Sequence, residues 1–260
     1  MKLTVLTENT AGGRFGAEHG LSYLIEHDGK TILFDTGHTD LFMKNASMAG
    51  YDLNDVVDYI VLSHGHWDHG DGLRYISGKT LFAHPSSFIK RYREADHSYI
   101  GLALTGEEIK EKFDLITSEK PYRITDKIIF LGSIPRKNDF EAKKTTFVDE
   151  DGNDDLVPDD SAMAFILRDE IVVVTGCSHS GICNITDYAR EVTGIKKVKA
   201  VIGGFHLKRK DRQTEETVKY FRELNVERLY PSHCTELPAL AVFHDEFGIE
   251  QVKTGQRYYF

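Results

Sequence analysis

The sequence is poor in cysteine, proline and tryptophan, and it has no long apolar segment. Its 260 residues include three cysteines, six prolines and one tryptophan. Three cysteines are too few for a disulfide framework, so we expect a reduced protein in the cytoplasm. The longest apolar runs, such as residues 171–174, have the length of a strand, and residues 1–8 are too short an apolar stretch for a secretory signal. The composition predicts no membrane partner.

An excess of positive charge is also missing. There are 32 lysines and arginines against 41 aspartates and glutamates, for a formal charge of −9. Nonspecific nucleic-acid binders need a basic face, so we expect no nucleic-acid partner. An acidic chain still accommodates a small anionic substrate if metal ions attract it. Twelve histidines are present, and histidine is the commonest metal ligand in proteins.

The order of predicted elements is that of an α/β protein. No repeat or linker divides the chain, so we expect a single domain over residues 1–260. Helices are predicted at 40–49, 87–94, 106–113, 185–192, 214–224 and 237–247, and strands at 1–8, 21–27, 30–34, 59–62, 81–83, 128–130, 145–147, 162–167, 171–175, 198–202 and 228–230. Thr105 and Glu108 have the spacing of a capping box. The acidic segment 149–155 lacks the spacing of a calcium loop and is typical of a solvated turn.

Four side chains that bind metals stand within six residues directly after the strand at 59–62. They are His64, His66, Asp68 and His69. Side chains two residues apart in an extended segment point the same way, so His64 and His66 can hold one ion. Asp68 and His69 follow where the chain turns and can reach a second ion. Imidazole with carboxylate suits zinc, and also iron or manganese.

This motif, His-x-His-x-Asp-His, with Phe34–Gly37 before it, resembles that of the metallo-β-lactamase superfamily, and the resemblance runs along the whole chain. It implies an αββα sandwich of two mixed sheets flanked by helices, with one or two divalent metal ions, in the first place zinc, at the strand ends. Three later strands also end in histidine, at His179, His206 and His233. Successive parallel strands bring their carboxyl ends to one edge of a sheet, where ligand sites form.

The superfamily pattern then suggests ligand sets. His179 is expected to complete the first site with His64 and His66, and His233 the second with Asp68 and His69. His206 is expected to contact substrate or transition state, although the roles of 206 and 233 can be exchanged. Asp68 is a ligand that can also accept a proton, so Asp68 and His206 are the candidate catalytic residues.

Further candidates follow from the same resemblance. Cys177 stands where the superfamily has a bridging aspartate, so it is a candidate additional ligand or a small buried residue. Asp35 is expected to orient a ligand histidine through hydrogen bonds, or to cap a turn. The first hairpin offers Glu8, Asn9 and His19 as candidate contacts to substrate.

Other segments resemble a smaller branch of hydrolases, grouped with an archaeal dihydropterin-ribofuranosyl-aminobenzene phosphate synthase. They are Glu8–Thr10, Glu18–Ser22, Pro158–Asp160, Gly176–Gly181, Gly203–Leu207 and Pro231–Thr235. The resemblance implies a metal-dependent hydrolase that uses metal-bound hydroxide on an ester, amide or phosphoryl substrate. The alternative is a transferase that joins a dihydropterin-methyl diphosphate to an aryl amine, with the metals binding the diphosphate. A flavin-linked di-iron oxidoreductase is disfavoured because His66 stands where that branch prefers glutamate.

Overall fold

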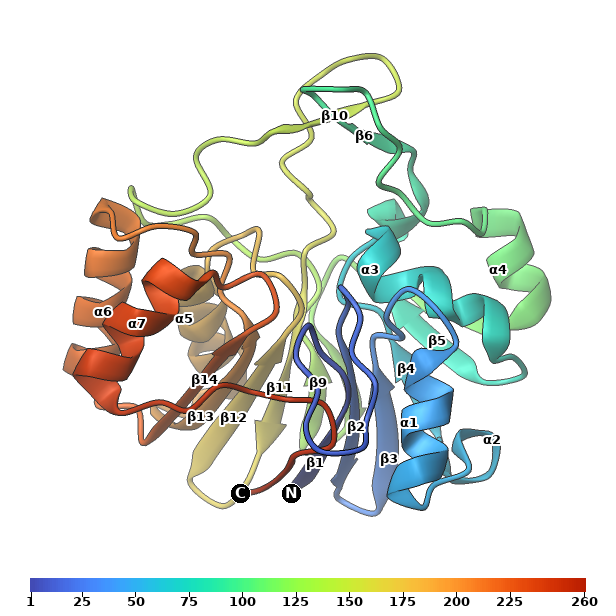
Figure 1. Cartoon of the computed structure of the whole chain (residues 1–260), viewed down its shortest axis with the longest axis horizontal. Coiled ribbons are helices and arrows are strands. Elements are labelled where there is room, and N and C mark those ends of the chain that lie inside the picture. Colours follow the sequence, from blue (N-terminus) through green and yellow to red (C-terminus); the bar gives the residue numbers. More distant parts are fainter. The chain divides into compact units, whose positions relative to one another are not determined.

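The computed structural model describes all 260 residues, and the chain divides into two compact units. Unit 1 comprises residues 1–119, 144–159 and 253–259, and unit 2 comprises residues 120–143 and 160–252 with Phe260. Each unit is built on one large mixed sheet with helices against it (Figure 1). None of the helices combines the length and the apolar character that crossing a membrane requires.

Unit 1 contains a seven-stranded sheet in the order β15-β1-β2-β3-β4-β5-β7. The strands are β1 (Lys2–Thr7), β2 (Ser22–His27), β3 (Lys30–Phe34), β4 (Tyr59–Val61), β5 (Thr80–Ala83), β7 (Asp114–Thr117) and β15 (Arg257–Tyr259). The first strands pair antiparallel, whereas β3, β4, β5 and β7 run parallel. Two of the parallel strands, β3 and β4, therefore end at the same edge and deliver Asp35 and the histidine-rich segment there.

One face of this sheet is covered by helices of the same unit (Figure 1). The helical elements are α1 (Leu41–Ala49), α2 (Leu53–Val56), α3 (Trp67–Gly70), η1 (Asp71–Tyr75), η2 (Pro85–Phe88) and α4 (Gly106–Lys112). Leu24, Leu33 and Ile60 belong to the same buried cluster as Phe42 and Ala46 of α1. Alternate residues of a strand point to one face, which explains why every second apolar residue joins this core.

The helix predicted at residues 87–94 is wrong. The chain forms a 3₁₀ turn, η2, and then the short strand β6 (Arg91–Arg93), which pairs antiparallel with β10 (Phe147–Asp149). Phe88, Ile89 and Tyr92 are the only apolar or aromatic residues of the predicted segment, too few for a helix face that packs on the core. Arg91 instead points inward and is fully buried.

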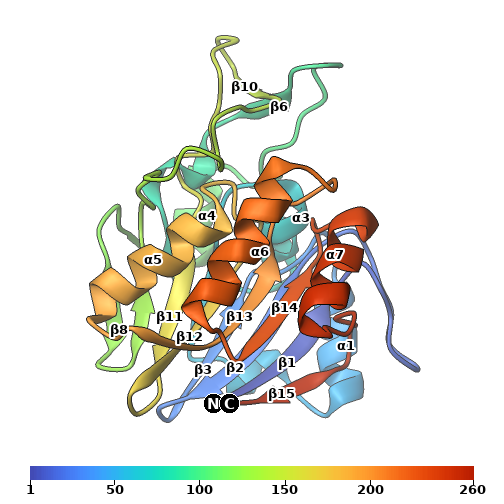
Figure 2. The same cartoon turned by 90° about the vertical axis from the view of Figure 1, so that its left-hand side faces the viewer.

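Unit 2 contains a six-stranded sheet in the order β14-β13-β12-β11-β9-β8. Its strands are β8 (Tyr122–Thr125), β9 (Ile128–Phe130), β11 (Ala162–Ile166), β12 (Glu170–Thr175), β13 (Lys197–Gly204) and β14 (Arg228–Ser232). The last three run parallel, and the connections between them carry α5 (Ile182–Thr193) and α6 (Arg212–Leu224). With α7 (Leu237–Phe247), these helices cover one face of the sheet (Figure 2).

Most predicted elements of unit 2 are confirmed, including the hairpin of β11 and β12 and the helix α7.

The acidic segment 149–155 is the turn that its composition predicts, with Asp149 accepting hydrogen bonds from the backbone N–H groups of Asp151 and Asn153. The sequence did not predict β7, β8 and β15, which are short edge strands with exposed or half-exposed residues.

Helix α4 begins with the capping box that the sequence predicts. The Thr105 side chain accepts from the Glu108 backbone N–H, and the Glu108 carboxylate accepts from the Thr105 N–H at 2.8 Å. Replacing Thr105 with alanine should lower the free energy of unfolding by about 1 kcal/mol, because the first turn loses an acceptor. Urea denaturation measures this loss, and Thr105→Ser, which keeps the hydroxyl, should retain most of the stability.

Candidate metal centre

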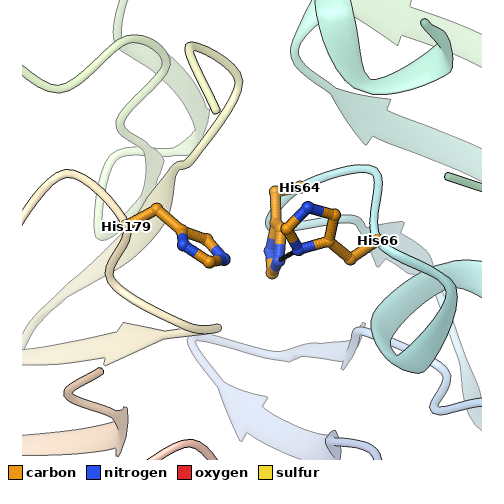
Figure 3. Close-up of side chains that lie close together, drawn as sticks. All are labelled: His64, His66 and His179. Carbon is orange, nitrogen blue, oxygen red and sulfur yellow. Dashed lines mark hydrogen bonds between the residues drawn. The ribbon is translucent and has the colours of Figure 1, made fainter. Parts of the chain in front are cut away.

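The histidine-rich segment follows β4, and its last residues form the short helix α3. The centroid of the His64 ring lies 4.6 Å from that of His66 and 4.3 Å from that of His69. Nε2 of His64 is 3.0 Å from Nδ1 of His66, the pair joined by a dashed line in Figure 3. All three rings are buried. Unit 1 thus gathers three buried imidazoles side by side, each with ring nitrogens that can bind a metal ion.

Gly65, between the first two histidines, allows the segment to pass close to the chain after β5. A Cβ added at this position would lie 1.8 Å from the carbonyl oxygen of Ser87. Any side chain would therefore push the segment away from η2. The glycine in His64-Gly65-His66 fixes the path of the backbone that carries both rings.

Asp35 organises this segment from the end of β3. Its carboxylate accepts three hydrogen bonds of 2.7 Å, from the N–H and hydroxyl of Ser63 and from Nδ1 of His69. Because Nδ1 of His69 donates, its Nε2 is the nitrogen that carries the lone pair. The hydroxyl of Ser63 lies 2.9 Å from Nδ1 of His64 and, as a donor to Asp35, accepts from that ring. The Nε2 atoms of His64 and His69 therefore both carry a lone pair. In metal sites, carboxylates behind the ligand histidines fix the tautomer of the rings in the same way.

Replacing Asp35 with asparagine should weaken metal binding by about 10–100-fold, because an amide cannot accept all three of these hydrogen bonds and hold both tautomers. Competition between the zinc-loaded protein and a chromogenic chelator measures the affinity. Asp40→Asn removes a carboxylate that pairs at the surface with Lys44 and should leave it unchanged. Equal affinities of the two variants would contradict the role of Asp35.

Asp68 lies in α3, beside the three rings. Its Oδ2 atom is 3.9 Å from Nε2 of His69 and 3.2 Å from Nε2 of His19. Nδ1 of His19 lies 3.4 Å from the amide nitrogen of Asn9, and the backbone N–H of Asn9 donates to the carboxylate of Glu8. Unit 1 thus connects three candidate substrate contacts to Asp68, and the side chain of His19 is 57% exposed.

A buried ion network that the sequence did not predict supports the same segment. Oδ2 of Asp159 accepts from the backbone N–H of Gly65 at 2.7 Å. Arg91 donates to both carboxylate oxygens of Asp159, at 2.8 and 3.2 Å, and its Nε lies 3.1 Å from Asp155. The only sequence signal was Pro158–Asp160 in the family resemblance, which gave no role to Asp159. Arg91 and Asp159 tie the strand pair β6 and β10 to the metal-binding segment.

In unit 2 the predicted histidines follow three parallel strands. His179, His206 and His233 come after the ends of β12, β13 and β14. The rings of His179 and His206 lie 4.5 Å apart, centroid to centroid. His206 and His233 have φ angles of 51° and 49°, and Ser178 has 56°. Left-handed backbone in non-glycine residues persists only where the surrounding structure fixes it, and it is frequent at functional sites.

Two buried carboxylates accept hydrogen bonds from the segment that follows β12 and carries His179. Asp160 accepts from the backbone N–H of Ser180 at 2.8 Å. Glu141 accepts from the backbone N–H groups of Cys183 and Asn184, at the start of α5. A carboxylate at a helix N-terminus satisfies donors that have no partner within the helix. These two residues fix the turn between β12 and α5, and the sequence did not predict either of them.

Burial changes the proton affinity of several groups. Desolvation, followed by the charge of Arg91, lowers the pKa of His66 to about 3, so the ring is neutral at physiological pH and can bind a metal. Desolvation raises the pKa of Asp160 to about 6. Burial would raise the pKa of the Cys234 thiol, but hydrogen bonds with Cys177 and His206 lower it well below its ordinary value.

The donor sets fit divalent metal ions. Unit 1 supplies three imidazoles and the carboxylate of Asp68, with tautomers set by Asp35 and Ser63. In unit 2 one nitrogen or sulfur atom from each of Cys177, His206 and Cys234 lies within 4.8 Å of the others. Nitrogen, oxygen and sulfur ligands in these numbers suit zinc and other transition metals.

Comparisons with known proteins identify the family of the chain. The model of the metallo-β-lactamase superfamily matches residues 15–233. The chain belongs to the metallo-β-lactamase superfamily, and the predicted fold class is confirmed. It is similar over its full length to the solved structure of Tm1679, a metal-dependent hydrolase of the β-lactamase superfamily, with a TM-score of 0.89, 31% identity and 99% of that chain covered.

Two relatives come from the archaeon Methanocaldococcus jannaschii, and the first supports the predicted branch. One, 7,8-dihydropterin-6-methyl-4-(β-D-ribofuranosyl)-aminobenzene-5'-phosphate synthase, is 32% identical over 95% of this chain and 92% of its own length. The other, an uncharacterised protein, is 39% identical over 92% of both chains.

One comparison bears on the expected absence of a nucleic-acid partner. The endoribonuclease YSH1 of Candida glabrata is 32% identical over 44% of this chain and 16% of its own length. A relative that acts on RNA leaves that expectation without support, so RNA belongs among the substrates to be tested.

Proposed function

We propose that this protein is a metal-dependent hydrolase that acts on an ester, amide or phosphoryl bond of a small molecule. The observation that carries the proposal is the hydrogen-bonded chain from Asp35 through Ser63 to His64, with its branch to His69. This chain presents two buried, basic Nε2 atoms, which a hydrolytic metal site needs and an ordinary polar loop does not.

The ligand sets proposed are those that the sequence suggests. His64, His66 and His179 would hold one ion, and Asp68, His69 and His233 a second, with Cys177 as a candidate additional ligand. Zinc is the first candidate, and iron and manganese accept the same donors. When bound, a divalent ion supplies Lewis acidity and lowers the pKa of the water that it coordinates.

Residues of the chain itself would transfer the proton and stabilise the transition state. Oδ2 of Asp68 would accept the proton that water loses, and Nε2 of His19, 3.2 Å away and exposed, would pass it to solvent. His206 would donate a hydrogen bond to the oxygen that gains negative charge in the transition state. Its Nδ1 is buried and has no hydrogen-bond partner in the protein, which suits a donor kept for substrate.

We propose an anionic substrate, since metal ions attract anions and Asn9 and His19 add hydrogen-bond donors beside Asp68. The cytoplasm is the compartment proposed, because none of the three cysteines forms a disulfide. No nucleic-acid partner is proposed, and the RNA arm of the experiment below tests this.

The second candidate is a transferase that joins a dihydropterin-methyl diphosphate to an aryl amine. The similarity to the synthase of M. jannaschii over 95% of this chain favours it. The same ligands would hold metals that bind the diphosphate leaving group, and an aromatic side chain such as Trp67 or Phe205 would stack on the pterin.

One panel of reactions separates the candidates. The purified protein is assayed with a nitrophenyl phosphodiester, a nitrophenyl ester, a lactone and a short RNA, and with a dihydropterin-methyl diphosphate plus aryl amine, with mass spectrometry of the products. Hydrolysis of a small ester or phosphodiester that a chelator abolishes supports the first proposal. A condensed pterin–amine product supports the second. Cleavage of RNA alone would contradict both.

A further inference from the structure

We propose that Cys177, His206 and Cys234 of unit 2 form a soft-metal site of two thiolates and one imidazole, with zinc as its natural occupant. The sequence offered Cys177 as a lone candidate ligand and gave no role to Cys234. The proposal gives His206 a ligand role, which the sequence left open as an exchange with His233. It replaces the roles that the hydrolase proposal gives Cys177 and His206, and it needs no residue of the His64–His69 segment.

The three donors come from the ends of three neighbouring parallel strands. Cys177 follows β12, His206 follows β13 and Cys234 follows β14, and in the sheet β13 lies between the other two. Register pairs Gly203 with Pro231 and Gly204 with Ser232, so the end of β13 is level with the end of β14. The donors therefore meet at one end of the sheet without any long or flexible connection.

Two glycines at the end of β13 make room for the thiols. A Cβ at Gly204 would lie 2.5 Å from Sγ of Cys234 and 3.3 Å from Cα of Cys177. At Gly203, where φ is 132°, a Cβ would lie 2.0 Å from the carbonyl oxygen of Thr175. Any other residue would force the strand ends apart. The two glycines therefore allow both cysteines to lie close to His206.

The donor atoms are close enough for one ion. Sγ of each cysteine and a ring nitrogen of His206 lie within 4.8 Å of one another. A tetrahedral zinc ion with Zn–S bonds of about 2.3 Å holds its sulfur ligands roughly 3.8 Å apart. Changes of about 1 Å in side-chain rotamers would complete the geometry. Nδ1 of His206 is buried and has no hydrogen-bond partner. No internal hydrogen bond therefore competes with a metal ion at that atom.

The chemistry of this set differs from that of unit 1. Two thiolates and one imidazole prefer soft or borderline ions, whereas imidazoles with a carboxylate accept harder ones. Binding would require both sulfur atoms as thiolates. The opposing interpretation is a purely structural pair of thiols, in which Sγ of Cys234 donates to the carbonyl oxygen of Cys177, 3.4 Å away.

Cobalt(II) distinguishes the two, because a thiolate bound to cobalt gives an intense charge-transfer absorption in the near ultraviolet that nitrogen and oxygen ligands do not give. The metal-free full-length protein is titrated with cobalt(II) chloride under reducing, anaerobic conditions. We expect this absorption to appear and to saturate. Its absence from the wild-type protein at full cobalt loading would overturn the proposal, and this outcome does not depend on any variant.

Matched variants then assign the band. Cys177→Ser and Cys234→Ser should each lower the absorption by about half or more. Cys183→Ser, in α5, should leave it intact, because Cys183 is not among these donors. His64→Ala should also retain the band, so failure of the proposed hydrolase site is seen separately. A band lost in Cys183→Ser, or unchanged in Cys234→Ser, would overturn the assignment. Circular dichroism of each variant verifies its fold.

Discussion

Replacing His66 with alanine is expected to remove metal from the histidine-rich segment and to reduce hydrolysis by at least about 100-fold. Substitutions that only disturb the groups behind a ligand already cost about 10–100-fold, and His66 is itself a proposed ligand. Its ring is buried, neutral and 3.0 Å from Nε2 of His64. Metal content by elemental mass spectrometry and the turnover of the best substrate from the panel measure both effects.

The control is His27→Ala, at the end of β2 and outside the cluster of rings. It should retain wild-type metal content and turnover. Zinc added at a concentration well above the wild-type dissociation constant should restore part of the activity of His66→Ala if the loss is one of affinity. Wild-type metal loading and turnover in His66→Ala would contradict the assignment of this segment as the metal centre.

Replacing Asp159 with alanine is expected to destabilise the protein by about 3–5 kcal/mol, because it leaves the guanidinium of Arg91 buried with half of its ionic partners. Arg91 is fully buried and keeps only Asp155, 3.1 Å away, as a charged partner. The backbone N–H of Gly65 also loses its acceptor, so the metal-binding segment should loosen. Urea denaturation measures stability, and the chelator competition measures zinc affinity.

Asp151→Ala is the matched control for this effect. It removes an exposed carboxylate from the turn after β10 and should change stability by less than about 0.5 kcal/mol. Asp159→Asn keeps an acceptor for Gly65 while removing the charge, so it should bind zinc better than Asp159→Ala. If all three variants unfold at the same urea concentration as the wild type, the network of Arg91 does not support the site.

The sequence predicted the parts of the fold that repeat a simple pattern. β12 and β13 contain the apolar runs Ile171–Val174 and Ala200–Ile202, which are followed by small or polar residues, and the helices between the parallel strands have apolar residues at helical spacing. The ends of these strands could be placed because histidine follows each of them. The helix predicted at 87–94 failed because Arg91, a residue ordinarily exposed, is buried here by partners more than sixty positions away.

The sequence predicted the candidate ligands of the site but not the residues that hold the ligand segments in place. His64, His66, Asp68 and His69 lie within six residues, so local spacing was sufficient to group them. Asp159, Glu141 and Asp160 act on the backbone of distant segments through one or two hydrogen bonds each, and no local pattern encodes such contacts. The relation between Cys177 and Cys234 was missed for the same reason, because they are 57 positions apart and meet only through the register of parallel strands.

An anomalous difference map at the zinc edge, from crystals of the zinc-loaded protein, tests the metal centre most directly. We predict a peak about 2.0–2.1 Å from Nε2 of His64 and from a ring nitrogen of His66, with Nδ1 of His69 still bound to Asp35. A map in which His64 and His66 bind no ion, while zinc occupies other residues or no residue at all, would contradict it.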